Sequence, residues 1–469
     1  MGWNSSYTSK SIGFVFIVFL SSLLIFPGKL YGIEWLLAAF IICVFVFYNI
    51  QALQNRWNNY SDKAFIVRLF WTSLFIRIVV MLILLLISYS TWNMFFYVGA
   101  IDEMKYYRIA SEAAEIFRVS GVSDAYSHIL ETYLFEISDT GFPTFQTFLF
   151  IVFGYSPILI KLTYCAIGSL AVVRLYKLSQ ILFEQPVARL SAILFMLFPI
   201  GWFFSVVIMK ETTMVLLIVE AIILTAKLQR SYKTSTLLAL LFFIIVIFFF
   251  RSAISILLVM GAALSMFMQV KKRSLVVNIL VIAILLLGYL YFLQSTGKAE
   301  QYYNQYTDTN AYVEQRFLTG SKVNPYTSVV NAPIYFSISL FAPFPSFVNV
   351  PISFGRDIPH DEYYYHVAGC FVWVILAYFS IYGLYHAIRF RRRELAPLWI
   401  FILGYEFVLL RSMLFTSVRF TYSIKPFLLI MAAYGIYELK NKKWFTLYLI
   451  AAFIMIIGWN YVRLKGRGG

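Results

Sequence analysis

The apolar residues of this chain are gathered into continuous runs of about twenty residues, and this pattern constrains the fold more than any other feature. A helix of about twenty apolar residues crosses the ~30 Å hydrocarbon core of a bilayer. Only helices and closed barrels satisfy their backbone in lipid, and runs that are continuous rather than alternating indicate helices. Thirteen such runs lie near residues 11–28, 33–51, 66–90, 156–176, 187–207, 211–228, 234–250, 252–270, 274–294, 367–388, 396–414, 420–438 and 444–461. The sequence predicts an all-α polytopic membrane protein with about 13 transmembrane helices, forming a single transmembrane domain over residues 1–469.

Composition agrees with this prediction, since 61% of the residues are hydrophobic and only 13% are charged. Soluble domains are roughly 45–50% apolar and about 25% charged. A net charge of +16 would suit nucleic acid, but much of it lies in short clusters between the apolar runs, such as Lys271-Lys272-Arg273. That placement is the positive-inside pattern of membrane proteins. We therefore expect contact with membrane lipids and not with nucleic acid, and we predict a multi-pass protein of the inner (plasma) membrane.

The basic clusters also predict a topology. With the N-terminus in the cytoplasm, the cytoplasmic side receives the basic connectors 52–65, 174–189, 227–233, 271–273, 389–393 and 440–443. This agreement requires that two further apolar stretches, 142–154 and 331–347, do not cross the membrane. We predict that both are re-entrant or interfacial elements on the outer face.

Two long connectors then face outward, at residues 91–141 and 295–366. The first has a net charge of −5, from Asp102, Glu103, Glu112, Glu115, Asp124, Glu131, Glu136 and Asp139 against Lys105, Arg108 and Arg118. Within 103–118, apolar residues recur at three- and four-residue spacing, which predicts an amphipathic helix on the membrane surface. The second connector is rich in tyrosine and asparagine and includes Tyr363 and Tyr364, whose rings could stack on a sugar or an isoprenoid chain.

The pair Asp102-Glu103 is the strongest candidate for chemistry in the first connector. It follows a predicted transmembrane helix and opens the amphipathic one. A carboxylate at this place could act as a general base on an incoming hydroxyl group, with its neighbour keeping it basic or orienting a partner. The alternative is purely local, because acids are favoured at helix N-termini by the helix dipole.

Four cations are predicted at the outer ends of helices, where the positive-inside pattern disfavours them: Lys210, Arg251, Arg411 and Arg419. Ionisable residues at membrane depth are costly and usually mark a ligand site. Together on the side that carries Asp102, these cations would suit a phosphate or pyrophosphate group. The alternative is that each extends its side chain to lipid head groups.

Other polar residues keep further interpretations open. Glu220 and Glu406 lie inside predicted spans, where they pair helices or serve a transport pathway. His360 and His366 lie near two carboxylates in the second connector, but their spacing matches no zinc site. A divalent metal is possible, although no convincing site supports one, and no other cofactor is indicated.

The first connector resembles that of integral-membrane glycosyltransferases of the GT-C type, most closely the protein O-mannosyltransferase and aminoarabinose-transferase-like branches. The resemblance spans roughly residues 85–230 and rests on Asp102-Glu103, Tyr106-Tyr107, Ala110, Pro143, Phe153-Gly154-Tyr155-Ser156, Lys161-Leu162, Val187-Ala188-Arg189-Leu190 and Phe198-Pro199. It implies transfer of a sugar from a polyprenyl-phosphate carrier to a saccharide, lipid or protein acceptor on the outer face. It further implies Asp102 as general base and Glu103 as its assistant. We also predict Tyr106 and Tyr107 of the first connector, and Tyr363 and Tyr364 of the second, as substrate-loop residues.

Two other functions stay open. The pair Lys210-Glu211 resembles polysaccharide polymerases of the O-antigen type, which use sugars carried on polyprenyl pyrophosphate. A flippase or transporter of lipid-linked sugars is the alternative from a different class, although the spans show no recognisable inverted repeat.

Overall fold

The computed structural model describes residues 2–30, 32–96, 101–134, 136–268, short stretches within 283–295, 339–349, 362–391, 393–411, 417–439, 441 and 443–466. Over these residues the chain is all-helical and has no β-strand, apart from one isolated bridge between Leu30 and Val348. The all-α prediction is confirmed for this part of the chain.

Six helices are long and apolar enough to cross a membrane. They are α1 (Ser5–Ile25), α2 (Ile33–Trp57), α3 (Asp62–Trp92), α7 (Pro157–Leu182), α18 (Glu362–Phe390) and α22 (Lys443–Gly466). A seventh span is possible if α8 (Gln185–Met196) and α9 (Pro199–Val206), which are bent by 55° at their junction, count as one. The chain is therefore a multi-pass membrane protein.

The prediction of thirteen spans is not confirmed. Several of the predicted spans are shorter helices in the structure: α11 (Thr234–Phe250), α12 (Ser252–Phe267), α19 (Ala396–Arg411) and α21 (Lys425–Glu438). Helix α10 (Lys210–Arg230) is longer but carries five charged residues besides its apolar ones. The predicted span 274–294 falls mostly outside the described residues, and so does the first part of the predicted re-entrant stretch 331–347, of which residues 339–347 are described.

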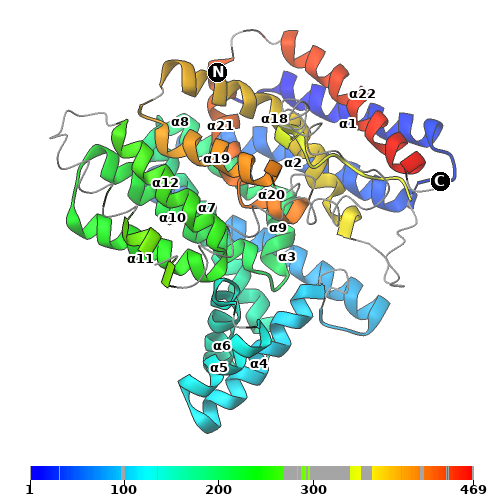
Figure 1. Cartoon of the computed structure of the whole chain (residues 1–469). Helices are drawn as coiled ribbons and strands as arrows, with labels where there is room; N and C mark the ends of the chain where they lie inside the picture. Colours follow the sequence, from blue (N-terminus) through cyan, green and yellow to red (C-terminus); the bar gives the residue numbers. More distant parts are fainter. Residues whose placement is uncertain are drawn as a thin grey trace.

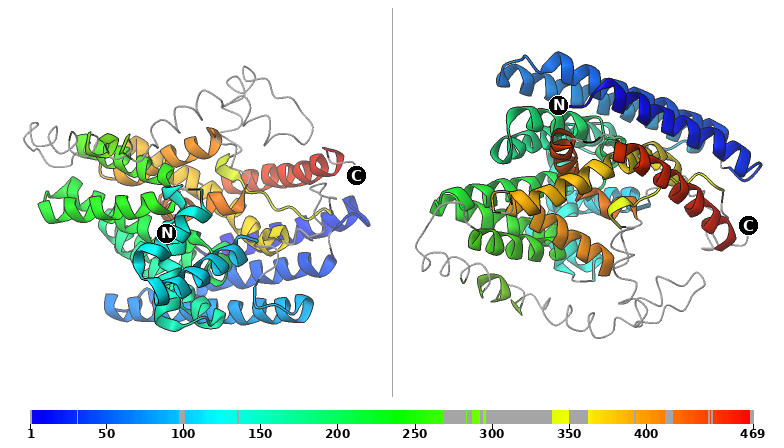
Figure 2. Two further views of the ribbon diagram at one scale, coloured as in Figure 1. Left: turned by 60° about the horizontal axis from the view of Figure 1, so that its bottom comes forward. Right: turned by 90° about the horizontal axis from the view of Figure 1, so that it is seen from above.

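Helices α18 and α21 pack together in the middle of the body (Figures 1 and 2). Two glycines let their backbones touch. A Cβ atom added at Gly383 would lie 2.1 Å from the Met431 carbonyl oxygen, and one added at Gly435 would lie 2.1 Å from the Phe379 carbonyl oxygen. Small residues at such crossings allow the close packing that holds membrane helices together.

We expect Gly383→Ala to destabilise the protein, because one methyl group has no room unless the two helices separate. Overpacking of this kind costs about 1–3 kcal/mol. The measurement is the thermal unfolding midpoint of the purified protein in detergent. Gly458→Ala in α22 is the matched control, since a Cβ there meets nothing within 4 Å. Equal midpoints for the two variants would contradict the direct backbone contact.

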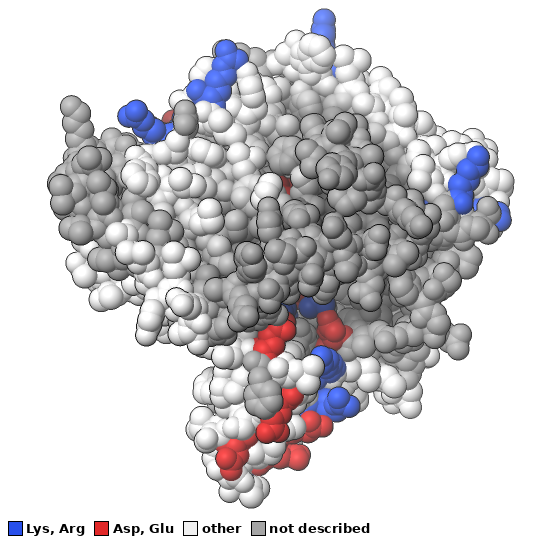
Figure 3. All heavy atoms as spheres, in the orientation of Figure 1, with Lys and Arg blue, Asp and Glu red and all other residues white. Residues whose placement is uncertain are grey.

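The first outer connector folds into a helical appendage, defined here as α4 (Ile101–Ser120), α5 (Val122–Thr132), the 3₁₀ turn η1 (Ile137–Asp139) and α6 (Gly141–Phe153). It projects from one end of the helical body (Figure 1). Helix α4 covers the predicted amphipathic segment, and its buried face, with Ile109, Ala110 and Ala113, packs against α5 and α6. In the view of Figure 3, acidic side chains gather on the appendage with some Lys and Arg side chains beside them, and the acids are far fewer on the body.

Candidate functional site

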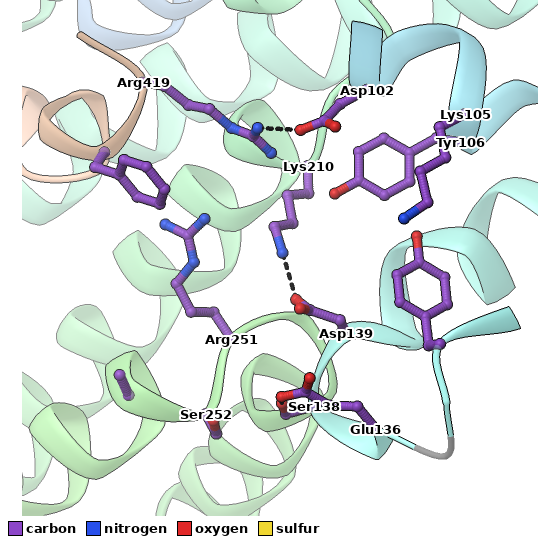
Figure 4. A pocket seen from close by; sticks show the side chains of 13 residues that line it. Asp102, Lys105, Tyr106, Glu136, Ser138, Asp139, Lys210, Arg251, Ser252 and Arg419 are labelled. Carbon is purple, nitrogen blue, oxygen red and sulfur yellow. Dashed lines mark hydrogen bonds and ion pairs between the residues drawn. The ribbon is translucent and has the colours of Figure 1, made fainter. Parts of the chain in front are cut away.

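A polar cavity of about 390 Å³ lies where the appendage meets the helical body (Figure 4). Two groups of residues face each other across it. The appendage contributes Asp102, Lys105, Tyr106, Tyr133, Glu136, Ser138 and Asp139, and the body contributes Lys210, Arg251, Ser252, Ala253, Arg419 and Phe420. The cavity therefore has a mainly acidic and tyrosine-bearing wall opposite a cationic wall.

The three cations of this wall lie at or next to places where one helix ends and another begins. Lys210 is the first residue of α10, after extended backbone at Val207 and Met209. Arg251 separates α11 from α12 with an extended conformation (φ −167°, ψ 102°). Arg419 lies in the short helix α20 (Val418–Tyr422). Breaking the helices at these points turns charged side chains toward the cavity instead of toward the surrounding apolar surface.

Arg419 bridges two carboxylates. Its Nη1 donates to Oδ2 of Asp102, at the cavity, and its Nε donates to Oε1 of Glu211, which is fully buried. Burial acts to lower the pKa of the Arg419 guanidinium, but the negative charge of Glu211, with smaller contributions from Tyr106 and Asp102, raises it overall. The guanidinium is therefore held as a fixed positive charge.

Lys210 faces the opposite corner of the cavity. Its Nζ forms an ion pair with Oδ1 of Asp139 and donates to the Phe250 carbonyl oxygen at 3.2 Å. Burial and the nearby Arg251 guanidinium lower the pKa of Lys210 below its ordinary value, although Asp139 acts in the other direction. Bringing a further anion into the cavity would relieve this repulsion between the two cations.

Arg251 is the third cation of this wall (Figure 4). Its Nη2 is 3.9 Å from Oε1 of Glu211, and its guanidinium lies 4.8 Å from the centre of the Phe420 ring. The next two residues, Ser252 and Ala253, begin α12 and also line the cavity. The N-terminal end of a helix carries a partial positive charge, so this end of α12 adds to the cationic wall.

The appendage wall offers hydrogen-bonding and stacking groups. Tyr106 packs its ring on Phe142, at 4.8 Å between ring centres, and is mostly buried. Burial raises the pKa of the Tyr106 phenol well above its ordinary value, so the hydroxyl stays protonated and can donate a hydrogen bond. Lys105 lies over the ring of Tyr133, with Nζ 5.0 Å from the ring centre.

The structure brings together five of the residues that the sequence singled out: Asp102, Tyr106, Lys210, Arg251 and Arg419 all line the cavity. The first and last of these residues, Asp102 and Arg419, are more than 300 positions apart in the sequence, so the fold is what brings them to one cavity. Of the other candidates, the side chains of Arg411, Tyr363 and Tyr364 and all of His360 lie outside the described part of the chain.

Glu103 and Tyr107 lie away from the cavity. Glu103 is fully buried, where its Oε1 accepts hydrogen bonds from Lys161 Nζ and from the Ile208 amide at 3.1 Å. The Tyr107 hydroxyl donates to the Tyr155 carbonyl oxygen at 2.5 Å. Both contacts fasten α4 to its neighbours.

Sequence reasoning assigned no role to several cavity residues, including Asp139, Glu136, Lys105 and Tyr133. The nearest signal is that Asp139 immediately precedes the apolar stretch of α6, as Asp102 follows the apolar stretch of α3. No motif spacing links the two acids, since the intervening helices α4 and α5 fold back to bring them to one cavity.

The remaining sequence candidates form no metal site among the described residues, and the two intramembrane carboxylates lie outside the cavity. No group of three His, Cys, Asp or Glu side chains that could hold a metal ion is found in the part of the chain that the structure describes. His366 is buried with its ring 4.5 Å from that of Phe203, measured between centres. Glu220 accepts two hydrogen bonds from Arg174, and Glu406 is buried near Lys425.

An apolar groove of about 670 Å³ adjoins the polar cavity. Helices α6, α7, α10 and α11 line it with side chains that include Phe145, Phe148, Ile167, Leu216, Leu217 and Val246. Two of its lining residues, Thr140 and Phe250, are the direct sequence neighbours of the cavity residues Asp139 and Arg251. The charged lining of the cavity therefore passes directly into the apolar lining of the groove at two places in the sequence, between Asp139 and Thr140 and between Phe250 and Arg251.

No protein-family model matches the chain, and a search of curated proteins finds no match either. The chemistry of the cavity and of its adjoining groove is therefore the basis for a functional proposal.

Proposed function

We propose that the chain is a glycosyltransferase that moves a sugar from a polyprenyl-phosphate carrier to an acceptor on the outer face of the membrane. One observation carries the proposal: a carboxylate faces a cluster of three cations in a cavity that opens beside an apolar groove. A lipid-linked sugar phosphate has the same sequence of chemical groups, with an apolar chain, an anion and a polyhydroxyl ring. The resemblance to GT-C glycosyltransferases supports the same substrate class.

The proposed reaction is a displacement at the anomeric carbon of the sugar. Asp102 accepts the proton of an acceptor hydroxyl through Oδ1, because Oδ2 is bonded to Arg419. The acceptor oxygen forms a bond to the anomeric carbon as the bond from that carbon to the phosphate oxygen breaks. The electron pair of the broken bond leaves with the phosphate, which gains negative charge.

The cationic wall stabilises that leaving group. Lys210 is about 6% exposed in its side chain and Arg251 about 17%, so both are mostly withdrawn from water. Preorganised charges in a water-poor site stabilise developing negative charge more strongly than charges in bulk water do. Arg411 remains a fourth candidate for the same role.

The remaining parts of the substrate have matching surfaces. The isoprenoid chain would lie in the apolar groove, and Phe148, which is 58% exposed, leaves that groove open at the surface. The sugar and the acceptor would lie against Tyr106, Tyr133 and the acids of the appendage, since carboxylates accept hydroxyl hydrogen bonds and aromatic rings stack on sugars. Glu103 would assist indirectly, by anchoring the helix that carries Asp102.

The test uses the purified full-length protein in liposomes with a panel of polyprenyl-phosphate monosaccharides and a membrane extract as the source of acceptors. We expect release of free polyprenyl phosphate and a sugar-bearing acceptor for at least one donor. Empty liposomes with the same extract provide the control for background hydrolysis.

The same assay separates the alternatives. Consumption of polyprenyl-pyrophosphate oligosaccharides, with growth of the saccharide, would replace the proposal with an O-antigen-type polymerase. Movement of an intact lipid-linked sugar between leaflets, with no bond broken, would replace it with a flippase or transporter.

A further inference from the structure

We infer that Glu211 is a positioning residue that acts through Arg419 to hold Asp102 in place at the cavity. The inference rests on the proposed function for its catalytic meaning. Its structural basis is a continuous chain of contacts from the cavity surface into the core, formed by Asp102, Arg419 and Glu211.

The geometry of the Arg419 guanidinium lets the buried contact fix the exposed one. Arg419 uses Nη1 for Asp102 and Nε for Glu211. The guanidinium is planar and presents its N–H groups in a rigid fork, so fixing the direction of one N–H fixes the others. Glu211 is fully buried, whereas the Asp102 side chain is 40% exposed. The buried end of the chain therefore sets the orientation of the exposed end.

Glu211 also supplies the negative charge that lets the cations converge. Arg419 and Arg251 both point at its Oε1 atom, and Lys210 is its immediate sequence neighbour. Three cations from three separate segments would repel one another without a counter-charge behind them. Since Glu211 does not line the cavity, its charge would hold the arginines in position without competing for a substrate.

Glu211→Gln tests the inference with little steric change. The second carboxylate oxygen, Oε2, has no hydrogen-bond partner in the described part of the structure, so the amide replaces a group that bonds to nothing there. We expect the rate constant for transfer at saturating donor to fall about tenfold or more. Affinity for sugar-free polyprenyl phosphate should change less than about threefold, because the loss of a negative charge favours an anionic ligand and offsets the added repulsion among the cations. A misplacement of about 1 Å in a reacting group can cost about 10²-fold in rate.

Two variants frame that result. Glu220→Gln removes a carboxylate charge from the same helix, where Glu220 pairs with Arg174 outside the cavity, and it should leave the transfer rate unchanged. Arg251→Ala should differ from Glu211→Gln in that it weakens the binding of polyprenyl phosphate. A Glu211→Gln protein with full turnover, or with binding lost as severely as in Arg251→Ala, would overturn the positioning role.

A measurement without any transfer step keeps the inference separate from the proposed function. The thermal unfolding midpoints of Asp102→Asn, Glu211→Gln and the double variant form a cycle. We expect effects that do not add, and we expect them to become additive when Arg419→Gln removes the bridge. Additive effects in the native background would refute the chain of contacts, whereas failure of every donor with the native protein would refute only the proposed reaction.

Discussion

Replacing Asp102 by asparagine is expected to abolish sugar transfer while the protein stays folded. Asparagine has nearly the same shape and can still contact Arg419, but its amide cannot accept the acceptor proton. General-base catalysis contributes about 10²–10⁴-fold to a rate, so turnover should fall by at least about 10³-fold when the base is also the group that orients the acceptor. The measurement is the rate of polyprenyl phosphate release from the best donor in liposomes.

Asp124→Asn is the matched control. Asp124 lies in the first turn of α5, in the same appendage but outside the cavity, so its loss should leave turnover within about twofold. Undiminished turnover in Asp102→Asn would remove Asp102 as the base. In that case Asp139, another acid of the appendage wall, would be the next carboxylate to replace.

The second large effect is expected at the cationic wall. Replacing Arg251 by alanine should weaken binding of sugar-free polyprenyl phosphate by about ten- to a hundredfold, because a hydrogen bond to a charged group contributes about 1.5–3 kcal/mol and each 1.4 kcal/mol is a factor of ten. Arg251→Lys should recover part of the loss, since lysine restores the charge without the planar fork. Binding is measured by equilibrium dialysis of detergent micelles or by thermal shift.

Lys227→Ala controls for the general loss of a positive charge, because Lys227 lies in the last turn of α10, at the other end from Lys210. Its affinity should match that of the native protein. Unchanged binding in both Arg251→Ala and Lys227→Ala would indicate that Arg251 contacts lipid head groups and not the carrier phosphate.

The sequence was sufficient to predict the all-helical membrane class and to single out five of the 13 residues that line the cavity, since hydrophobicity and rare charges can be read from local composition. It could not predict which apolar runs are long helices. The run over 187–207 bends at Pro199, because proline lacks an amide hydrogen and disfavours helix in the residue before it. The runs flanking Arg251 are helices of 17 and 16 residues, each shorter than the about twenty residues that cross the hydrocarbon core of a bilayer.

The acid pair shows a second limit. Asp102 and Glu103 are consecutive, and side chains of consecutive residues in a helix point about 100° apart. Only one of them can face a given cavity, and the structure directs Asp102 to the cavity and Glu103 to the core. The sequence spacing of the acids does not predict which one faces the cavity, nor that Asp139 approaches it. Both depend on how α4 and α5 pack against the body.

The buried contact between Glu103 and Lys161 has a consequence for motion. It joins α4 of the appendage to α7 of the body in the buried interior, on the side of α4 that faces away from the cavity, so the two walls cannot separate without breaking a buried ion pair. Removing one partner of such a buried pair costs about 3–5 kcal/mol, so the contact strongly favours the arrangement in which the two walls stay together. Substrates would therefore enter a cleft of nearly constant width. The motions that admit them would be side-chain movements and not a hinge motion between the appendage and the body.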